Sequence, residues 1–253
     1  DLTVTMNVAT SHGGGLAVLN GSSAAVSHDA HFLENTATGG NGGGLLVANK
    51  SDVGIENTLI AESCVAGSSG GGLAVSASST LAAKHGSFLY DAAEMNGGGV
   101  YVEDGAQVAF SEFTHVDSCT SSASGGGVAL TSSATLNTPL LRAQGNVAGL
   151  RGGGMYSSSS ATVSALAIEL VENQAASGGA AYAAEYSSVS CQSLLAERNS
   201  ATLDGGGAAL TTSAALVVSV NGSFISNTAG SDGGGLVIES AGAIHYANGA
   251  LLT

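Results

Sequence analysis

The chain has 253 residues, of which 39 are glycine, while Lys, Arg, Asp and Glu together make only 9%. Glycine at about twice its usual frequency, one proline and 44% apolar residues exclude collagen and charge-driven disorder. Nineteen acidic residues against five basic ones give a net charge of −14. This charge repels phosphate backbones, so we expect no nucleic acid partner.

Membrane and targeting segments are not evident in the sequence. No apolar run reaches the roughly 18 to 20 residues of a membrane-spanning helix, so we expect no direct membrane insertion by this segment. The N-terminus, Asp1-Leu2-Thr3-Val4, does not have the pattern of a signal peptide. If the protein is secreted, its targeting segment is expected outside this chain.

Glycine triplets recur at a nearly constant interval. They begin at Gly13, Gly42, Gly70, Gly97, Gly125, Gly152, Gly205 and Gly233, with a Gly178-Gly179-Ala180 variant in the remaining place. Nine copies, about 27 residues apart, indicate one supersecondary unit stacked many times. We therefore predict a single solenoid domain over residues 1–253, in which glycine supplies the positive φ angles and close backbone approach of tight corners.

Each repeat is expected to contain three short strands, because apolar residues alternate in three places. In the first copy, one strand follows the triplet at Leu16 and Val18, a second lies near Ala24, and a third lies near Phe32. Ser, Asn, Asp and Gly separate the strands, as is typical of turns. The sequence predicts an all-β, single-stranded parallel β-helix of about nine turns, right-handed by the bias of parallel crossovers.

One position shortly before each triplet is predicted to form a ladder at a corner of the coil. This corner ladder consists of Asn7, Asn35, Cys64, Asp91, Cys119, Asn146, Asn173, Asn199 and Asn227. Asparagine tolerates αL geometry and can hydrogen-bond the equivalent side chain one rung away. We expect the ladder to be architectural.

Two copies carry a motif pair that resembles a known family. Phe32-Leu33-Glu34-Asn35 leads to Gly42-Gly43-Gly44-Leu45, and Phe224-Ile225-Ser226-Asn227 leads to Gly233-Gly234-Gly235-Leu236. These segments resemble the FxxN and GGA(I/L/V) motifs of the chlamydial polymorphic outer-membrane proteins, although GGG replaces the usual GGA. The resemblance implies a pectin-lyase-like right-handed β-helix at a cell surface, as an adhesin or autotransporter passenger.

Catalytic chemistry is not indicated by the charged residues. Pectin-lyase-like enzymes carry acidic clusters beside Lys or Arg, and Glu103-Asp104 is the one adjacent acidic pair, expected in a surface turn. The basic residues are dispersed over separate rungs: Lys50, Lys84, Arg142, Arg151 and Arg198. We therefore expect the protein not to be an enzyme.

Metal and cofactor binding are not indicated either. His28, Asp29 and His31 could chelate a metal if all three faced one way, but residues three apart on an extended segment point to opposite faces. No other histidine spacing makes a ligand set. We expect no metal and no cofactor.

The three cysteines do not form a disulfide framework. Cys64 and Cys119 occupy the same corner two rungs apart, near 9 to 10 Å at about 4.8 Å per rung. This distance exceeds the roughly 7 Å limit for bridging. Cys191 falls at an inward strand position, so we expect three buried free thiols.

Three N-glycosylation sequons are candidates for modification. They are Asn20-Gly-Ser, Asn49-Lys-Ser and Asn221-Gly-Ser. Asn20 and Asn49 both stand seven residues after their triplets, and therefore in the same turn of neighbouring rungs. Modification would require a eukaryotic secretory route.

The outward residue of the first strand is apolar or aromatic in every copy. The column is Ala17, Leu46, Ala74, Tyr101, Ala129, Tyr156, Tyr182, Ala209 and Val237. Its larger members, Leu46, Tyr101, Tyr156, Tyr182 and Val237, define an interaction stripe. An apolar stripe is costly to leave in water, so we expect lateral packing on another chain, while neutral outward alanines and ordinary strand tyrosines remain the alternative interpretation.

Function is predicted from these features together. Leu2/Val4 and Ala250/Leu252 match the same strand phase, and open β edges invite pairing, so we expect a segment of a longer β-helix or an end-to-end stacked unit.

The favoured interpretation is a non-enzymatic, extracellular shaft or spacer in a cell-surface appendage or filament, such as a mastigoneme-like structure, with protein partners. The alternatives are a surface adhesin, including one that binds carbohydrate, and a carbohydrate-active β-helix enzyme. No rung carries a long insertion for a binding loop or substrate wall, which argues against both.

Overall fold

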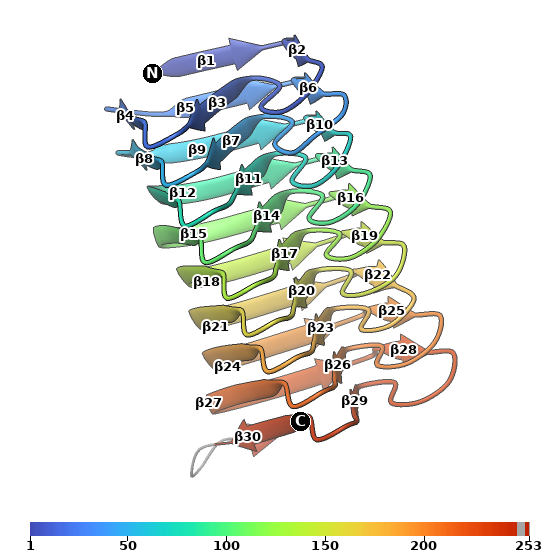
Figure 1. The fold of residues 1–253 in the computed structure, drawn as a ribbon. Helices are drawn as coiled ribbons and strands as arrows, with labels where there is room; N and C mark the ends of the chain where they lie inside the picture. Colours follow the sequence, from blue (N-terminus) through green and yellow to red (C-terminus); the bar gives the residue numbers. More distant parts are fainter. Residues whose placement is uncertain (247–250, 253) are drawn as a thin grey trace.

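The computed structural model describes residues 1–246 and 251–252, and these residues form a parallel β-solenoid of about nine turns (Figure 1). Three parallel sheets run along the solenoid axis, and strands from successive turns lie side by side in each. The predicted fold class is confirmed. None of the described residues belongs to a helix long and apolar enough to span a membrane.

Sheet A is the largest of the three, with thirteen strands. These are β1 (Leu2–Thr5), β4 (Ser23–Val26), β5 (Ala30–Leu33), β8 (Asp52–Ile55), β9 (Thr58–Glu62), β12 (Thr80–Leu89), β15 (Gln107–Asp117), β18 (Thr135–Gln144), β21 (Thr162–Val171), β24 (Ser188–Glu197), β27 (Ala215–Ile225), β30 (Ala243–Tyr246) and β31 (Leu251–Leu252).

Sheets B and C have nine strands each. Sheet B consists of β2 (Val8–Ala9), β6 (Thr36–Ala37), β10 (Val65–Ala66), β13 (Ala92–Ala93), β16 (Thr120–Ser121), β19 (Val147–Ala148), β22 (Gln174–Ala175), β25 (Ser200–Ala201) and β28 (Thr228–Ala229). Sheet C consists of β3 (Leu16–Leu19), β7 (Leu45–Ala48), β11 (Leu73–Val75), β14 (Val100–Val102), β17 (Val128–Leu130), β20 (Met155–Ser157), β23 (Ala181–Ala183), β26 (Ala208–Leu210) and β29 (Leu236–Ile238).

The grouping of strands into sheets differs from the sequence-based prediction in one respect. The second and third predicted strands both belong to sheet A, and from β12 to β27 they form one strand of 10 or 11 residues. β12 accordingly pairs with both β8 and β9. The third sheet is sheet B, whose two-residue strands are too short to show alternation in sequence.

The predicted register is confirmed rung by rung. Phe88 pairs with Ala61 on one side and with Val116 on the other, and Leu73 pairs with Leu45 and Val100. Neighbouring turns therefore match the triplet spacing, and equivalent residues form columns parallel to the axis.

The glycine triplet is required by backbone contacts between turns. In the fifth copy, Gly125 has a φ of +65°, which favours glycine. A Cβ on Gly126 would lie 2.5 Å from the carbonyl oxygen of Gly153 and 2.5 Å from the carbonyl carbon of Val147. The third place is more permissive, because Ala180 occupies it in one copy. The predicted role of glycine is confirmed at this corner.

The corner between sheets C and A does not depend on glycine. Two consecutive residues have positive φ there, for example Ser132 at 53° and Ser133 at 60°. The amide of Ala134 donates to the carbonyl of Thr131 at 3.2 Å and closes the turn. This corresponds to a type I′ turn. In most copies these positions carry Ser, Thr, Asp, Glu, Ala or Tyr.

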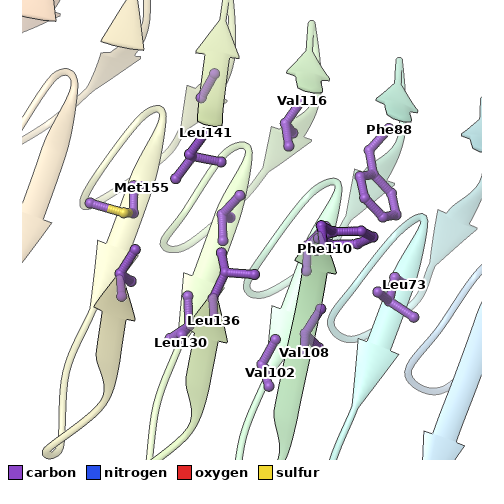
Figure 2. Close-up of a cluster of buried hydrophobic side chains, with 14 of the residues drawn as sticks. Leu73, Phe88, Val102, Val108, Phe110, Val116, Leu130, Leu136, Leu141 and Met155 are labelled. Carbon is purple, nitrogen blue, oxygen red and sulfur yellow. The ribbon is translucent and has the colours of Figure 1, made fainter. Parts of the chain in front are cut away.

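Apolar side chains from sheets A and C fill the lumen (Figure 2). Phe88 and Leu73 are fully buried, and Phe110 is 2% exposed. The rings of Phe88 and Phe110 meet edge to face, with centroids 6.2 Å apart. Each such side chain contributes about 1.5 to 3 kcal/mol when buried, so this narrow core stabilises every turn.

Candidate functional site: the corner ladder and the outer faces

The corner ladder lies inside the solenoid, at the junction of sheets A and B. From Asn35 to Asn199 its side chains are at most 1% exposed. The Asn173 Oδ1 atom accepts hydrogen bonds from the backbone N–H and the Nδ2 of Asn146, both at 3.0 Å. Asn173 Nδ2 donates to the Ala143 carbonyl at 3.0 Å. The predicted hydrogen bonding between equivalent asparagines is confirmed.

The αL conformation is not adopted by the ladder residues themselves. It belongs to the residue before each of them, as in Glu34 at 54°, Glu172 at 57° and Arg198 at 54°. The association of αL geometry with the ladder asparagines themselves is therefore wrong. The preceding residue makes the bend, and the bend turns the ladder side chain into the corner.

Cys64 and Cys119 take part in the ladder through their thiols. Cys64 Sγ donates to the Phe32 carbonyl, and Cys119 Sγ donates to the Phe88 carbonyl, each at 3.5 Å. Burial raises the pKa of Cys64 to about 12 and the pKa of Cys119 well above its usual range. Cys191 is also buried, and all three cysteines are free, as predicted.

The interaction stripe faces away from the lumen, on the outer side of sheet C, but it is less exposed than its proposed role requires. Leu46 is 4% and Tyr101 7% exposed. Three of the four alanines of the column are covered because they lie between larger neighbours: Ala129, for example, pairs with Tyr101 and Tyr156 and is fully buried. Ala17, in the first turn, is exposed. The column thus covers much of its own surface.

The Tyr101 hydroxyl has a specific partner in this face. It donates to Glu103 Oε2 at 2.8 Å and lies 3.4 Å from Thr131 Oγ1. Desolvation raises the pKa of Tyr101, and desolvation also raises the pKa of Glu103. Tyr101 is therefore a packed, hydrogen-bonded residue. Asp104 is exposed in the adjoining turn, as expected, whereas Glu103 is half-buried.

The half-buried part of the stripe lies further along sheet C. The rings of Tyr156 and Tyr182 stack with centroids 6.0 Å apart, and the Arg151 guanidinium lies 5.2 Å from the centroid of Tyr182. Val237 is also half-buried. These residues form the accessible portion of the predicted interaction stripe.

The three sequons are exposed. Asn20 and Asn49 lie in the turn between sheets C and A, where Asn49 Nδ2 donates to Asn20 Oδ1 at 3.3 Å. Asn221 lies in β27, where the pairing with β24 shifts register. Their glycosylation stays a prediction.

The histidine and acidic residues considered for a metal do not form a cluster. Asp29 Oδ1 accepts the Thr58 backbone N–H at 3.0 Å, which lowers the pKa of Asp29. Within residues 1–246 and 251–252, no group of three or more His, Cys, Asp or Glu side chains is arranged to hold a metal ion. Asp29 instead ties neighbouring turns together.

The basic residues are dispersed, as predicted, and most bond to neighbouring rungs. Lys84 Nζ donates to Asn57 Oδ1 at 3.1 Å, and Arg198 Nε donates to Glu172 Oε1 at 3.0 Å. Arg142 Nε lies 4.0 Å from Glu169. These exposed contacts add little stability individually.

A hollow on the outside of sheet A was missed by the sequence analysis. It has a volume of about 550 Å³ and is lined largely by small or apolar side chains, with Glu56 and Lys84 as its charged residues. Ala25, Gly54 and Ala82 are among its lining residues. The signal that could have revealed it is the run of small outward residues in the second strand of successive repeats.

The sequence also did not predict a side-chain contact on the surface between two neighbouring turns. His85 Nε2 lies 2.6 Å from Glu112 Oε2, and the His85 ring lies 4.4 Å from the ring of Phe113. The bulge between β12 and β15 brings these residues together, and a bulge has no regular signal in the repeat.

Comparison with known proteins assigns no family. No protein-family model, no curated protein and no solved structure matches the chain. The solenoid is therefore established by its own geometry, and the resemblance to the polymorphic outer-membrane proteins stays a prediction.

Proposed function

We propose that the chain is a non-enzymatic structural segment, a rigid rod in an extracellular appendage or filament. The observation that carries this proposal is the corner ladder from Asn7 to Asn227, whose turns are joined by side chain to backbone hydrogen bonds, buried except toward the two ends, with the Cys64 and Cys119 thiols spanning two of the steps. Buried polar networks of this kind rigidify a structure when they are satisfied. A rod needs such resistance to separation of its turns along its whole length.

The chemistry of the buried titratable groups supports the same proposal. Cys64, Asp91 and Cys119 are directed toward backbone groups of the corner and not into the hollow on sheet A, where Glu56 and Lys84 are the charged lining residues. Catalytic sites usually combine a pocket with titratable groups of perturbed pKa. Here the two features lie in different places, which favours architecture over carbohydrate chemistry.

The partners we propose are other proteins, through lateral contacts and end-to-end stacking. The lateral contact is assigned to the accessible end of the interaction stripe, at Tyr156, Tyr182 and Val237, with Arg151 beside them. Aromatic residues and arginine are enriched in protein interfaces. An adhesin of the polymorphic outer-membrane type is the second candidate, because the same tyrosine pair also suits a receptor or a carbohydrate.

Surface labelling of intact cells tests the proposed location. Both lysines, Lys50 and Lys84, are exposed, so a membrane-impermeant amine reagent should label the chain on intact cells without lysis. The labelled chain should then be recovered in the filament fraction. Labelling that appears only after lysis would contradict an extracellular rod. Release of reducing sugar ends from polysaccharides by the purified chain would favour the enzyme alternative.

A further inference from the structure

Ladder side chains on successive turns share one donor role. Each donates a hydrogen bond to a backbone carbonyl of the preceding turn, in the column that contains Phe32, Ala61 and Phe88. The donors are Asn35 to Val4, Cys64 to Phe32, Cys119 to Phe88, Asn146 to Val116, Asn173 to Ala143, Asn199 to Leu170 and Asn227 to Ala196. Asparagines donate through Nδ2 and cysteines through Sγ.

Asp91 is the exception between Cys64 and Cys119. Its Oδ1 accepts the Cys64 backbone N–H at 2.8 Å, as the Oδ1 of an asparagine does. Its Oδ2 stands where an asparagine has Nδ2, and this atom is buried without a hydrogen-bond partner. The register places the carbonyl of Ala61 in the acceptor position, because Ala61 pairs with Phe88, and Phe88 pairs with Val116. Two acceptors facing each other cannot bond unless one carries a proton.

The surroundings of Asp91 disfavour its charged form. The side chain is fully buried, and an ideal Cβ on Gly72 would lie 2.5 Å from Oδ2, so the site is closely packed. The titratable neighbours are the thiols of Cys64 and Cys119 and the carboxylate of Glu62. None of them is a cation that could compensate a carboxylate. Desolvation raises the pKa of Asp91 well above its usual range.

We propose that Asp91 is held as a carboxylic acid that donates to the Ala61 carbonyl oxygen, and that loss of this proton is a pH-sensitive switch that loosens the turns on either side. When neutral, Asp91 completes the corner ladder as an isostere of asparagine. When ionised, it leaves a buried charge and two opposed acceptors.

The sign of the pH dependence follows from proton linkage. The folded state retains the Asp91 proton above the pH at which the unfolded chain has lost it, so folding binds a proton in this range. The contribution of Asp91 to stability is therefore largest in acid and falls as pH rises above about 4. Each pH unit lowers the folding equilibrium constant by about tenfold until the folded-state pKa is reached.

The test compares wild type with Asp91→Asn and with Asp104→Asn, an exposed control in a surface turn. Unfolding in urea is measured from pH 5 to pH 8. We expect the folding equilibrium constant of Asp91→Asn, divided by that of wild type, to rise by about tenfold per pH unit over part of this range. The ratio for Asp104→Asn should stay flat.

A direct readout accompanies the titration. Infrared difference spectra of wild type minus Asp91→Asn at pH 5, the acid end of this range, should contain the carbonyl stretch of a protonated carboxylic acid. A carboxylate band in its place, a pH-independent stability ratio, or an Asp91→Asn chain that fails to fold would each overturn the proposal, because asparagine must serve this position at least as well as aspartic acid.

Discussion

Asn173 donates two hydrogen bonds to a single oxygen atom, Oδ1 of Asn199, from its backbone N–H at 2.8 Å and from its Nδ2 at 3.0 Å. The same pattern connects Asn146 to Asn173 and Asn199 to Asn227. The Oδ1 atom of each acceptor asparagine therefore accepts both the backbone N–H and the side-chain Nδ2 of the asparagine one turn before it. This arrangement makes the corner ladder a longitudinal tie, in addition to the β-sheets.

Replacement of one ladder asparagine should destabilise the fold strongly. Asn173→Ala removes the acceptor of two Asn146 groups and the donor to the Ala143 carbonyl. Unsatisfied buried groups cost about 1 to 3 kcal/mol each, so we expect a loss of about 3 kcal/mol or more. The midpoint of urea unfolding measures it. The exposed neighbour Gln174→Ala is the control, and an equal midpoint for the two variants would contradict the tie.

The middle glycine of a triplet should not tolerate a side chain. Gly126→Ala places a Cβ 2.5 Å from the Gly153 carbonyl oxygen, so the turns must separate locally and a loss of several kcal/mol is expected, on the order of overpacking or more. Gly54→Ala is the matched control, because its Cβ would meet nothing within 4 Å. The melting temperatures of both variants, from thermal unfolding, measure the difference. A drop in melting temperature for Gly54→Ala as large as for Gly126→Ala would be inconsistent with the packing described.

The three thiols should be unreactive in the folded protein. Burial raises the pKa of Cys64 to about 12 and of Cys191 to about 11, and only the thiolate is an effective nucleophile. Iodoacetamide at pH 8 should add no mass to native protein and three adducts after denaturation. A disulfide between Cys64 and Cys119 would refute the register, since Asp91 occupies the ladder position of the turn between them.

The partner contact should depend on the tyrosine pair. Tyr156→Asp and Tyr182→Asp should each abolish association with a partner chain, because a charge would replace a half-buried aromatic face. Circular dichroism should stay unchanged. Tyr186→Asp is the control, since Tyr186 is 72% exposed in a turn. Sedimentation of mixtures measures association, and unaltered complexes with the first two variants would remove this surface from consideration.

The sequence predicted the solenoid, its register and the corner ladder because each depends on a residue type repeated at one interval. It did not predict that two strands join in sheet A, since the buried positions of β12 shift phase between Ala83 and Gly86, and this shift divides the alternation into two separate runs. The sequence associated the αL bend with the asparagine and not with the residue before it. The residues that make this bend are as different as Glu34 and Arg198, so no shared residue type marks the position in the sequence.

The extent of burial was the other feature beyond the sequence. Spacing shows that Tyr101 and Ala129 face away from the lumen, but only the packing of adjacent rungs shows that they cover one another. In the same way, the repeat identifies Asp91 as a ladder residue, while its unpartnered oxygen emerges only from the hydrogen bonds of its neighbours.

The central claim, that this chain is part of an extracellular rod, is tested most directly by immunogold electron microscopy of cells that express it. An antibody against the exposed turn around Tyr186 should place gold particles along a surface appendage or filament, at regular intervals if units stack end to end. Particles confined to the cell interior, or scattered without relation to any polymer, would contradict the claim.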